Sequence, residues 1–195
     1  MIFELKYSMH IDLLFHVLSY LKVDNPSNCY NEKHIDNIKQ EKASFDYDII
    51  SAINELQEYY NKNFERLSMI NFLPFYSSTF EEMKSIFLNY KNFTNNDIKY
   101  FIEPFIKILD NESIFYFSYW NILHKNSEVR RLSIEKVLNG KFQKYISVFN
   151  YYNKNAMVYL LFSIVNNGRG FSGINSYFSA IAPFPVKDEY INYTF

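Results

Sequence analysis

The chain has 195 residues, of which 48% are hydrophobic, 20% are aromatic and 21% are charged. This length can bury a substantial core, and the composition excludes intrinsic disorder. The 4 Gly and 5 Pro are too few turn-forming residues for an all-β sandwich or barrel. The formal net charge of -1 excludes a general attraction to nucleic acid or anionic membranes, and the single cysteine, Cys29, excludes an internal disulfide and a Cys-rich zinc module.

The first residues and the longest apolar run of the sequence bear on the localisation of the protein. Glu4 and Lys6 interrupt the N-terminal segment, where a secretory signal peptide requires an uninterrupted apolar stretch. The apolar run at residues 156–165 has about half of the roughly 20 residues that a membrane-spanning helix needs. The basic residues between positions 125 and 144 are typical of a solvated helix face. We therefore expect a cytoplasmic protein that binds neither membrane nor nucleic acid.

The N-terminal quarter of the chain predicts a strand followed by helices. Residues 2–7 alternate apolar and polar side chains, which is the period of a half-buried strand. After Ser8, apolar residues recur at spacings of three and four, as on one helical face, and this helix should end near Val23. The Asp, Asn and Pro residues of segment 24–28 predict a loop, and a polar helix to about Ala43 should follow.

The middle of the chain predicts one long helix and a capped second one. An apolar stripe from Ile49 to Leu67 indicates the most regular helix, which ends before Pro74. Thr79 and Glu82 have the spacing of a capping box, in which the hydroxyl and the carboxylate each accept a hydrogen bond from a first-turn amide.

Three later helices are predicted to begin at asparagine-containing positions. These starts lie near Asn96, near Asn111 and at residues 126–127. Pro104 falls within the first of these helices. Because proline lacks the amide hydrogen and clashes with the preceding turn, we expect a kink or a break there.

The composition changes after Asn155. Segments 156–165 and 177–182 are rich in strand-forming residues, and three of the four glycines lie between them at positions 168, 170 and 173. These features predict two strands on either side of a glycine loop.

Together these elements predict an α+β fold. Residues 1–151 form a predominantly helical region with one N-terminal strand, and residues 152–195 form a β-rich segment that packs on it in a single domain. The N-terminal strand and the C-terminal strands should lie together in one small sheet.

The glycine segment matches a nucleotide-binding pattern. Gly168 to Gly173 read G-x-G-x-x-G after a predicted strand, as in a dinucleotide fingerprint. That fingerprint also requires a helix that opens at the last glycine, and Pro183 follows too soon for one. A glycine-permitted turn between two strands is the favoured interpretation. A small-ligand or nucleotide site stays as the third of three functional hypotheses.

The titratable residues predict no catalytic or metal site. His10, His16, His34 and His124 lack the spacing of metal ligands, and we interpret them as partly buried hydrogen-bonding residues. Cys29 lies five residues before His34 in a polar loop, without the oxyanion site that a nucleophilic thiolate needs. Since Walker A, EF-hand and His-Glu-x-x-His patterns do not occur, we assign no catalytic, cofactor-binding or metal residue.

Segments near both ends of the chain resemble one group of proteins. The C-terminal segments are residues 166–172 (NNGRGFS) and 178–185 (FSAIAPFP), and the N-terminal ones are residues 11–18 (IDLLFHVL) and 23–28 (VDNPSN). They resemble the lead-in to the catalytic helix, and the opening helix and loop, of clostridial-type bacterial proteins that look like zincin metallopeptidases.

The resemblance implies a substrate-binding strand. In that fold a strand at the sheet edge, just before the active-site helix, pairs with the main chain of an extended substrate. By position this role falls to Phe178, Ser179, Ala180, Ile181 and Ala182. Main-chain hydrogen bonds would fix the peptide, and the small alanines would let it approach closely. An ordinary edge strand without a substrate is the alternative.

The zinc-binding motif of zincins does not occur in the sequence. The resemblance therefore implies either the front portion of a longer metallopeptidase, with zinc bound only in the longer form, or a natural short form that cannot bind zinc by this route. A non-catalytic helical protein-interaction domain, with a Tyr- and Phe-rich surface, is the alternative function. The partner would be a peptide substrate or a protein, and an uncovered sheet face would favour self-association.

Overall fold

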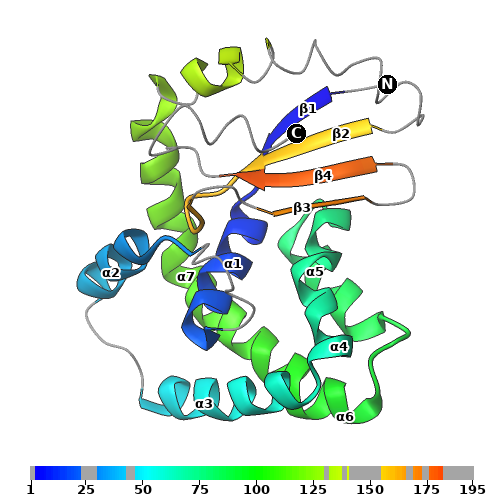
Figure 1. Cartoon of the computed structure of the whole chain (residues 1–195). Helices are drawn as coiled ribbons and strands as arrows, with labels where there is room; N and C mark the ends of the chain where they lie inside the picture. The colour runs from blue at the N-terminus through cyan, green and yellow to red at the C-terminus, as the bar shows by residue number, and fades with distance from the viewer. Residues whose placement is uncertain are drawn as a thin grey trace.

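Four strands form a mixed sheet at one end of a helical body (Figure 1). The computed structural model describes residues 3–22, 30–42, 47–129, 132–137, 140, 155–165, 169–172 and 176–181. Along the sequence, most of the helices come after the first strand and before the other three. The predicted α+β class, with a mostly helical body and a small sheet, is therefore confirmed.

The sheet joins the first strand to the last ones. Its strands are β1 (Phe3–Tyr7), β2 (Asn155–Leu160), β3 (Arg169–Ser172) and β4 (Ser176–Ile181), in the spatial order β1-β2-β4-β3. β1 runs parallel to β2, β2 runs parallel to β4, and β3 runs antiparallel to β4. The predicted pairing of the N-terminal strand with the C-terminal strands is therefore confirmed.

The glycine loop expected between two C-terminal strands is partly a strand. Residues 169–172, which include Gly170, form β3 and pair with Tyr177–Ala180 of β4. The prediction of a glycine turn is wrong at Gly170, where the backbone is extended, whereas Gly168 and Gly173 lie outside the described residues. Glycine permits an extended backbone as readily as a turn, so glycine spacing alone does not distinguish the two.

The helical body contains seven labelled α-helices between β1 and β2 within the described ranges, together with short 3₁₀ and π segments. Their bounds are α1 (Met9–Leu21), α2 (Glu32–Glu41), α3 (Tyr47–Lys62), α4 (Phe64–Leu67), η1 (Ser68–Asn71), η2 (Leu73–Tyr76), α5 (Phe80–Asn89), α6 (Asn95–Asp97), the π segment η3 (Ile98–Ile102) and α7 (Glu103–Asn126). Residues 132–137 form a further helical stretch. The predicted loop at residues 24–28 lies outside the described residues.

The central helix of the body is α1. The Ser8 side chain caps its N-terminus by accepting a hydrogen bond from the Ile11 amide, and Lys22 ends it in a left-handed conformation. Nearly every side chain of α1 is buried, which is the pattern of a helix surrounded by other elements on all sides. Helices α3 and α7 of the body pack against it. Polar residues of α1 must therefore find partners inside the protein.

The helix containing Pro104 neither breaks nor restarts. The helices α6 and α7 are joined through the π segment without interruption, and Asn111 lies inside α7 rather than at a helix start. In the π segment the Glu103 amide donates to the Ile98 carbonyl, five residues back. This wider turn immediately precedes Pro104, which cannot donate to a carbonyl in the preceding turn. Of the expected kink or break, the break does not occur, and a local change of helix type lies at this position instead.

The capping box predicted at Thr79 is only half formed. Thr79 accepts a hydrogen bond from the Glu82 amide at 3.1 Å, but the Glu82 carboxylate accepts from the Ser78 amide at 2.6 Å rather than from Thr79. A complete capping box occurs at α6 instead, where Thr94 and Asp97 accept from each other's amides. This box explains why a helix begins near Asn96, as expected.

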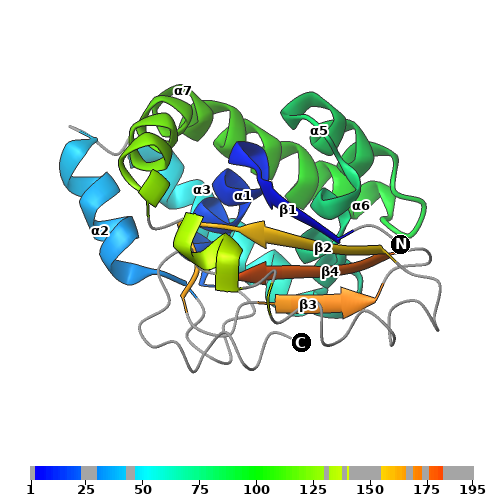
Figure 2. The same cartoon turned by 90° about the horizontal axis from the view of Figure 1, so that it is seen from above.

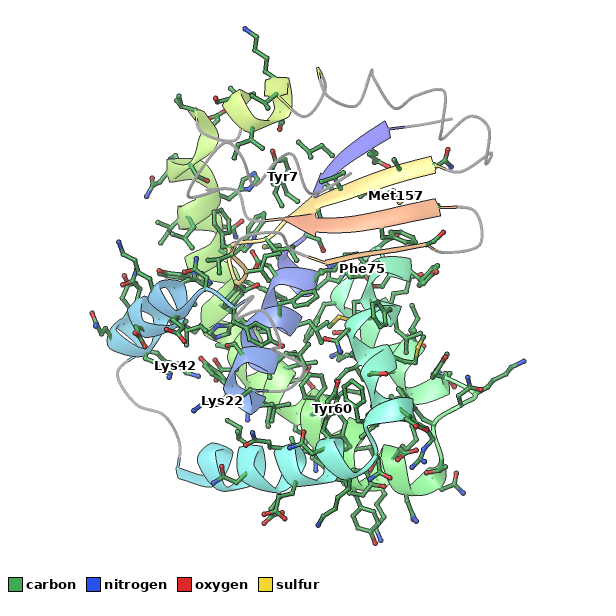
Figure 3. The ribbon with its side chains drawn as sticks, viewed as in Figure 1. Tyr7, Lys22, Lys42, Tyr60, Phe75 and Met157 are labelled. Carbon is green, nitrogen blue, oxygen red and sulfur yellow. The ribbon has the colours of Figure 1, made fainter. Side chains whose placement is uncertain are left out.

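Helices cover both faces of the sheet (Figure 2). On the face toward the helical body, Phe75 of η2 packs against Tyr159 and Phe178, with ring centroids 5.0 and 5.9 Å apart. Phe75 lies between the strands and the helices in Figure 3. On the other face, Ile134 and Val158 are buried in a second, smaller apolar cluster. The strands are thus sandwiched, as is usual for parallel strands.

Candidate functional site

The strand predicted to bind substrate is not at the edge of the sheet. β4 pairs with β2 along its whole length and with β3 from Tyr177 to Ala180. The edge placement of Phe178, Ser179 and Ala180 is therefore wrong, because strands lie on both sides of them, whereas Ile181 pairs with β2 alone among the described strands. Ala182 lies outside the described residues. Phe178 is also buried against Phe75, so its side chain belongs to the core.

The edge beside β4 is formed by β3. This strand runs antiparallel to β4 and has no second strand partner among the described residues. Gly170, in its middle, is exposed and carries no side chain that would keep another main chain away. β3 therefore holds the edge position that was expected for residues 178–182, one strand further out.

The opposite edge is formed by β1, which borders a cavity of about 590 Å³. The walls of the cavity come from β1, the start of α1, the connection between η2 and α5, the middle of α7, and Tyr159 of β2. Glu4 and Lys6 of β1 form an ion pair of 3.2 Å at this cavity. Both are partly exposed, as the alternating sequence predicts for the polar side of a half-buried strand.

His10 lies in the wall of this cavity as a neutral hydrogen-bonding group. Its Nδ1 atom is 3.1 Å from the Ser8 hydroxyl, and its Nε2 atom is 3.1 Å from the Ser77 hydroxyl. Burial lowers the pKa of His10, although the contact with Ser77 and the charge of Glu82 act in the opposite direction. His10 is therefore uncharged near neutral pH.

A buried polar network centres on Asp12 of α1. Its carboxylate accepts hydrogen bonds from the Trp120 indole at 2.9 Å, from the amides of Phe162 and Ser163 at 2.9 and 2.8 Å, and from the Ser163 hydroxyl at 2.5 Å. Burial raises the pKa of Asp12, and these four donors oppose the rise. The network ties α1 to α7 and to the segment that follows β2.

A second network links α1, α2 and α7 around Glu112. Lys42 donates a hydrogen bond to this carboxylate, and His16 Nε2 lies 3.6 Å from its Oε2 atom. Burial alone would raise the pKa of Glu112, but His16 and Lys42 together lower it. The Tyr20 hydroxyl lies 2.7 Å from His16 Nε2 and donates to Glu112 at 3.5 Å.

Two histidines on neighbouring helices share an aromatic environment in this network. His16 stacks on Tyr116 with ring centroids 4.7 Å apart, and His34 Nε2 lies 3.2 Å from the Tyr116 hydroxyl. Burial lowers the pKa of both histidines, and for His34 burial together with His16 lowers it to about 3. Both histidines are thus buried hydrogen-bonding residues, as expected.

Neither network has the composition of a zinc site. Across the described ranges, no group of three His, Cys, Asp or Glu side chains could hold a metal ion. Asp12, His16 and Glu112 are also almost completely shielded from solvent, so a substrate could not reach them. We therefore regard both networks as supports for the fold, and the two sheet edges as the candidate sites. Cys29 lies outside the described residues.

Sequence reasoning missed Asp12 and Glu112. The signal for Asp12 was a carboxylate inside an otherwise apolar helical run, which requires buried donors wherever it packs. Glu112 carried no local signal, because it lies on a helix with mixed polar and apolar residues.

Comparison with protein-family models, curated proteins and solved structures finds no match to this chain. Among the helices that the structure describes, none is long and apolar enough to cross a membrane.

Proposed function

We propose that this chain is the front portion of a zincin-like metallopeptidase. It supplies the helical scaffold and a substrate-binding edge strand, and it is not catalytically competent as given. The proposal begins from the resemblance of segments near both ends of the sequence to zincin-like proteins. It assigns the substrate-binding strand to β3 instead of to residues 178–182.

The observation that carries the proposal is the position of β3. It is an antiparallel edge strand directly before the last parallel strand of a mixed sheet. An edge strand presents a row of main-chain donors and acceptors to an extended peptide, and the exposed Gly170 lets that peptide approach. These features favour strand addition at β3 over the same process at β4, which has neighbours on both sides.

The described residues do not fit zinc. They contain no suitable group of three ligands, and the sequence contains no His-Glu-x-x-His. The metal ligands and the general base would therefore belong to a further segment, and zinc would be bound only by a longer form. The role proposed for this chain is to bind and orient the peptide main chain.

The test is to determine the coding sequence beyond Phe195 and the intact mass of the polypeptide in its source cell. We expect a longer product that continues into His-Glu-x-x-His, and that binds one zinc per chain by elemental analysis while the 195-residue chain binds none. A native mass of 23.5 kDa, or an extension without the motif, would overturn the proposal.

A separate observation favours the alternative, a non-catalytic helical interaction domain. Ile114, Ile122 and Val129 are 80%, 59% and 84% exposed. The spacing of eight places Ile114 and Ile122 near one face of α7, and Val129 lies in the helical turn just beyond the end of α7. Exposed apolar side chains at such spacing are typical of a surface that binds another protein. Sedimentation of the Ile122→Glu variant tests this: loss of self-association or partner binding supports the alternative, and unchanged behaviour contradicts it.

A further inference from the structure

The cavity beneath β1 has no role in the proposed substrate strand, because β1 and β3 are opposite edges of the sheet. Its volume of about 590 Å³ lies within the range of cavities that bind small ligands or large side chains. The question is which chemical group its walls would accept.

The walls combine aromatic rings with neutral hydrogen-bonding groups. Phe80, Phe117, Trp120 and Tyr159 supply the rings, while His10, Ser77, Ser78 and Thr79 supply donors and acceptors. The Ser77 hydroxyl lies 3.1 Å from His10 Nε2, which places a polar pair in the same cavity as the aromatic rings. A group with both an aromatic body and a hydroxyl would satisfy both kinds of wall.

The charges of the lining residues restrict the class of occupant further. Glu4 and Lys6 are the only lining residues with a formal charge, and they neutralise each other as an ion pair. A phosphate or a carboxylate would thus meet no unpaired cation, and a metal ion would meet no set of ligands. The chemistry favours a neutral occupant.

The cavity also adjoins β1, an outer strand of the described sheet. Within the described part of the chain, β1 pairs with β2 alone. In a strand added to β1, alternate side chains would point to the side of Glu4 and Lys6, which is the side of the cavity. In such an addition, the main-chain hydrogen bonds give the affinity, and the cavity gives the specificity for one side chain of the peptide.

We propose that the cavity binds a tyrosine side chain of an extended peptide segment whose main chain adds to β1 as a fifth strand. This site is independent of the one proposed at β3. It would recognise a partner by one neutral aromatic residue within an extended stretch.

The first test compares three capped pentapeptides by isothermal titration. Acetyl-Ala-Thr-Tyr-Thr-Ala-amide should bind at least tenfold more tightly than the same peptide with a central Asp, and a few-fold more tightly than the one with a central Phe. Equal affinities for the Tyr and Asp peptides would overturn the proposal.

The second test removes main-chain donors from the peptide and leaves the protein unchanged. Methylation of the Tyr nitrogen and of the following Thr nitrogen gives two peptides, because successive amides in a strand point in opposite directions. One of the two should bind at least tenfold more weakly than the other. Equal affinities would show that no strand is added.

The third test blocks the cavity in the protein. Ser78 is exposed and lines the cavity, so Ser78→Trp should reduce binding of the Tyr peptide at least tenfold. Ser118→Trp is the matched control, because Ser118 is exposed on α7 and does not line the cavity. Both variants should keep the circular dichroism spectrum of the parent. Unchanged binding by Ser78→Trp would place the peptide elsewhere, for example at β3, and would overturn the proposal while leaving the function proposed for β3 intact.

Discussion

At the scale of single residues, the chain depends on buried polar groups that are almost fully satisfied. Asp12 and Glu112 are shielded from solvent and each is held by several donors. His16 has one ring nitrogen, Nδ1, without a hydrogen-bond partner among the described residues. Such groups contribute little to stability when paired, but removing one partner leaves the other buried and unsatisfied.

Replacement of Asp12 should be severely destabilising. In Asp12→Ala the Trp120 indole and the Phe162 and Ser163 amides lose their acceptor inside the protein. We expect the free energy of unfolding to fall by about 3–5 kcal/mol, as measured by urea denaturation. The control is Asp110→Ala, which removes a half-exposed partner of Lys84 and should cost less than about 1 kcal/mol. Equal losses in the two variants would contradict the assignment.

The protein should lose stability as the pH falls below neutrality. The folded-state pKa of His34 is lowered from 6.5 to about 3, so the unfolded chain binds a proton that the folded chain does not. This stability is fully present above pH 6.5 and is lost as the pH falls toward 3, by about 2 kcal/mol between pH 6.5 and pH 5. His16 is shifted in the same direction and adds to the loss.

Urea denaturation at pH 7, 6 and 5 measures this dependence. His34→Gln retains a side chain that can hydrogen-bond to Tyr116 but removes the titrating group, so its stability should change less over this range. The interpretation fails if the two proteins have the same pH profile.

At the scale of elements, local patterns predicted most helices and the strands β1, β2 and β4. The alternation before Ser8 and the apolar stripe after it are properties of neighbouring residues, so periodicity reveals them. The order of strands is different, because it depends on which distant segments pair. The composition of β4 fits an edge strand and an inner strand equally well. The partner that makes it an inner strand is β3, a glycine-containing segment.

The candidate sites were less predictable than the fold for the same reason. The hydrogen-bond donors to Asp12 come from residues more than 100 positions away in the sequence, and no sequence spacing connects them with Asp12. The cavity beneath β1 likewise combines residues of β1, α5 and α7. Pairings of this kind arise from tertiary packing and have no local signature.

The edge position of β3 predicts contrasting effects of two adjacent proline substitutions. In an antiparallel pair, successive amides point alternately toward and away from the partner, so only one of Gly170 and Phe171 donates to β4. Of the two variants Gly170→Pro and Phe171→Pro, one should therefore lower the melting temperature much more than the other. The variant that lowers it less should lose binding of an extended peptide. Equal and large destabilisation would show that both sides of β3 are needed for the fold.

At the scale of the whole molecule, the sheet is assembled from both ends of the chain. β1 covers one side of β2, and the cluster of Ile134, Val158 and Leu160 lies on the sheet face opposite the helical body. The integrity of the sheet thus depends on a strand of only five residues.

Disruption of β1 should promote self-association. Leu5→Pro introduces a residue that cannot donate at this position and removes an apolar side chain that packs against the smaller cluster. With β1 displaced, β2 becomes an uncovered edge, and we expect oligomers by light scattering after size-exclusion chromatography. Lys6→Thr, which keeps the strand donor, should stay in the state of the parent protein. A monomeric Leu5→Pro variant with parental stability would contradict the role of β1.

The parallel pairing of β1 with β2 also determines when the protein can fold. The ribosome must make almost 150 further residues after Tyr7 before β2 exists, which takes roughly 7–30 s at ordinary rates of synthesis. Until then β1 has no strand partner within the described sheet, because β4 and β3 are made later still. Contacts between residues so distant in the sequence slow folding. The helical body can begin to form during synthesis, whereas the sheet and both of its edges are completed only after β4 has left the ribosome.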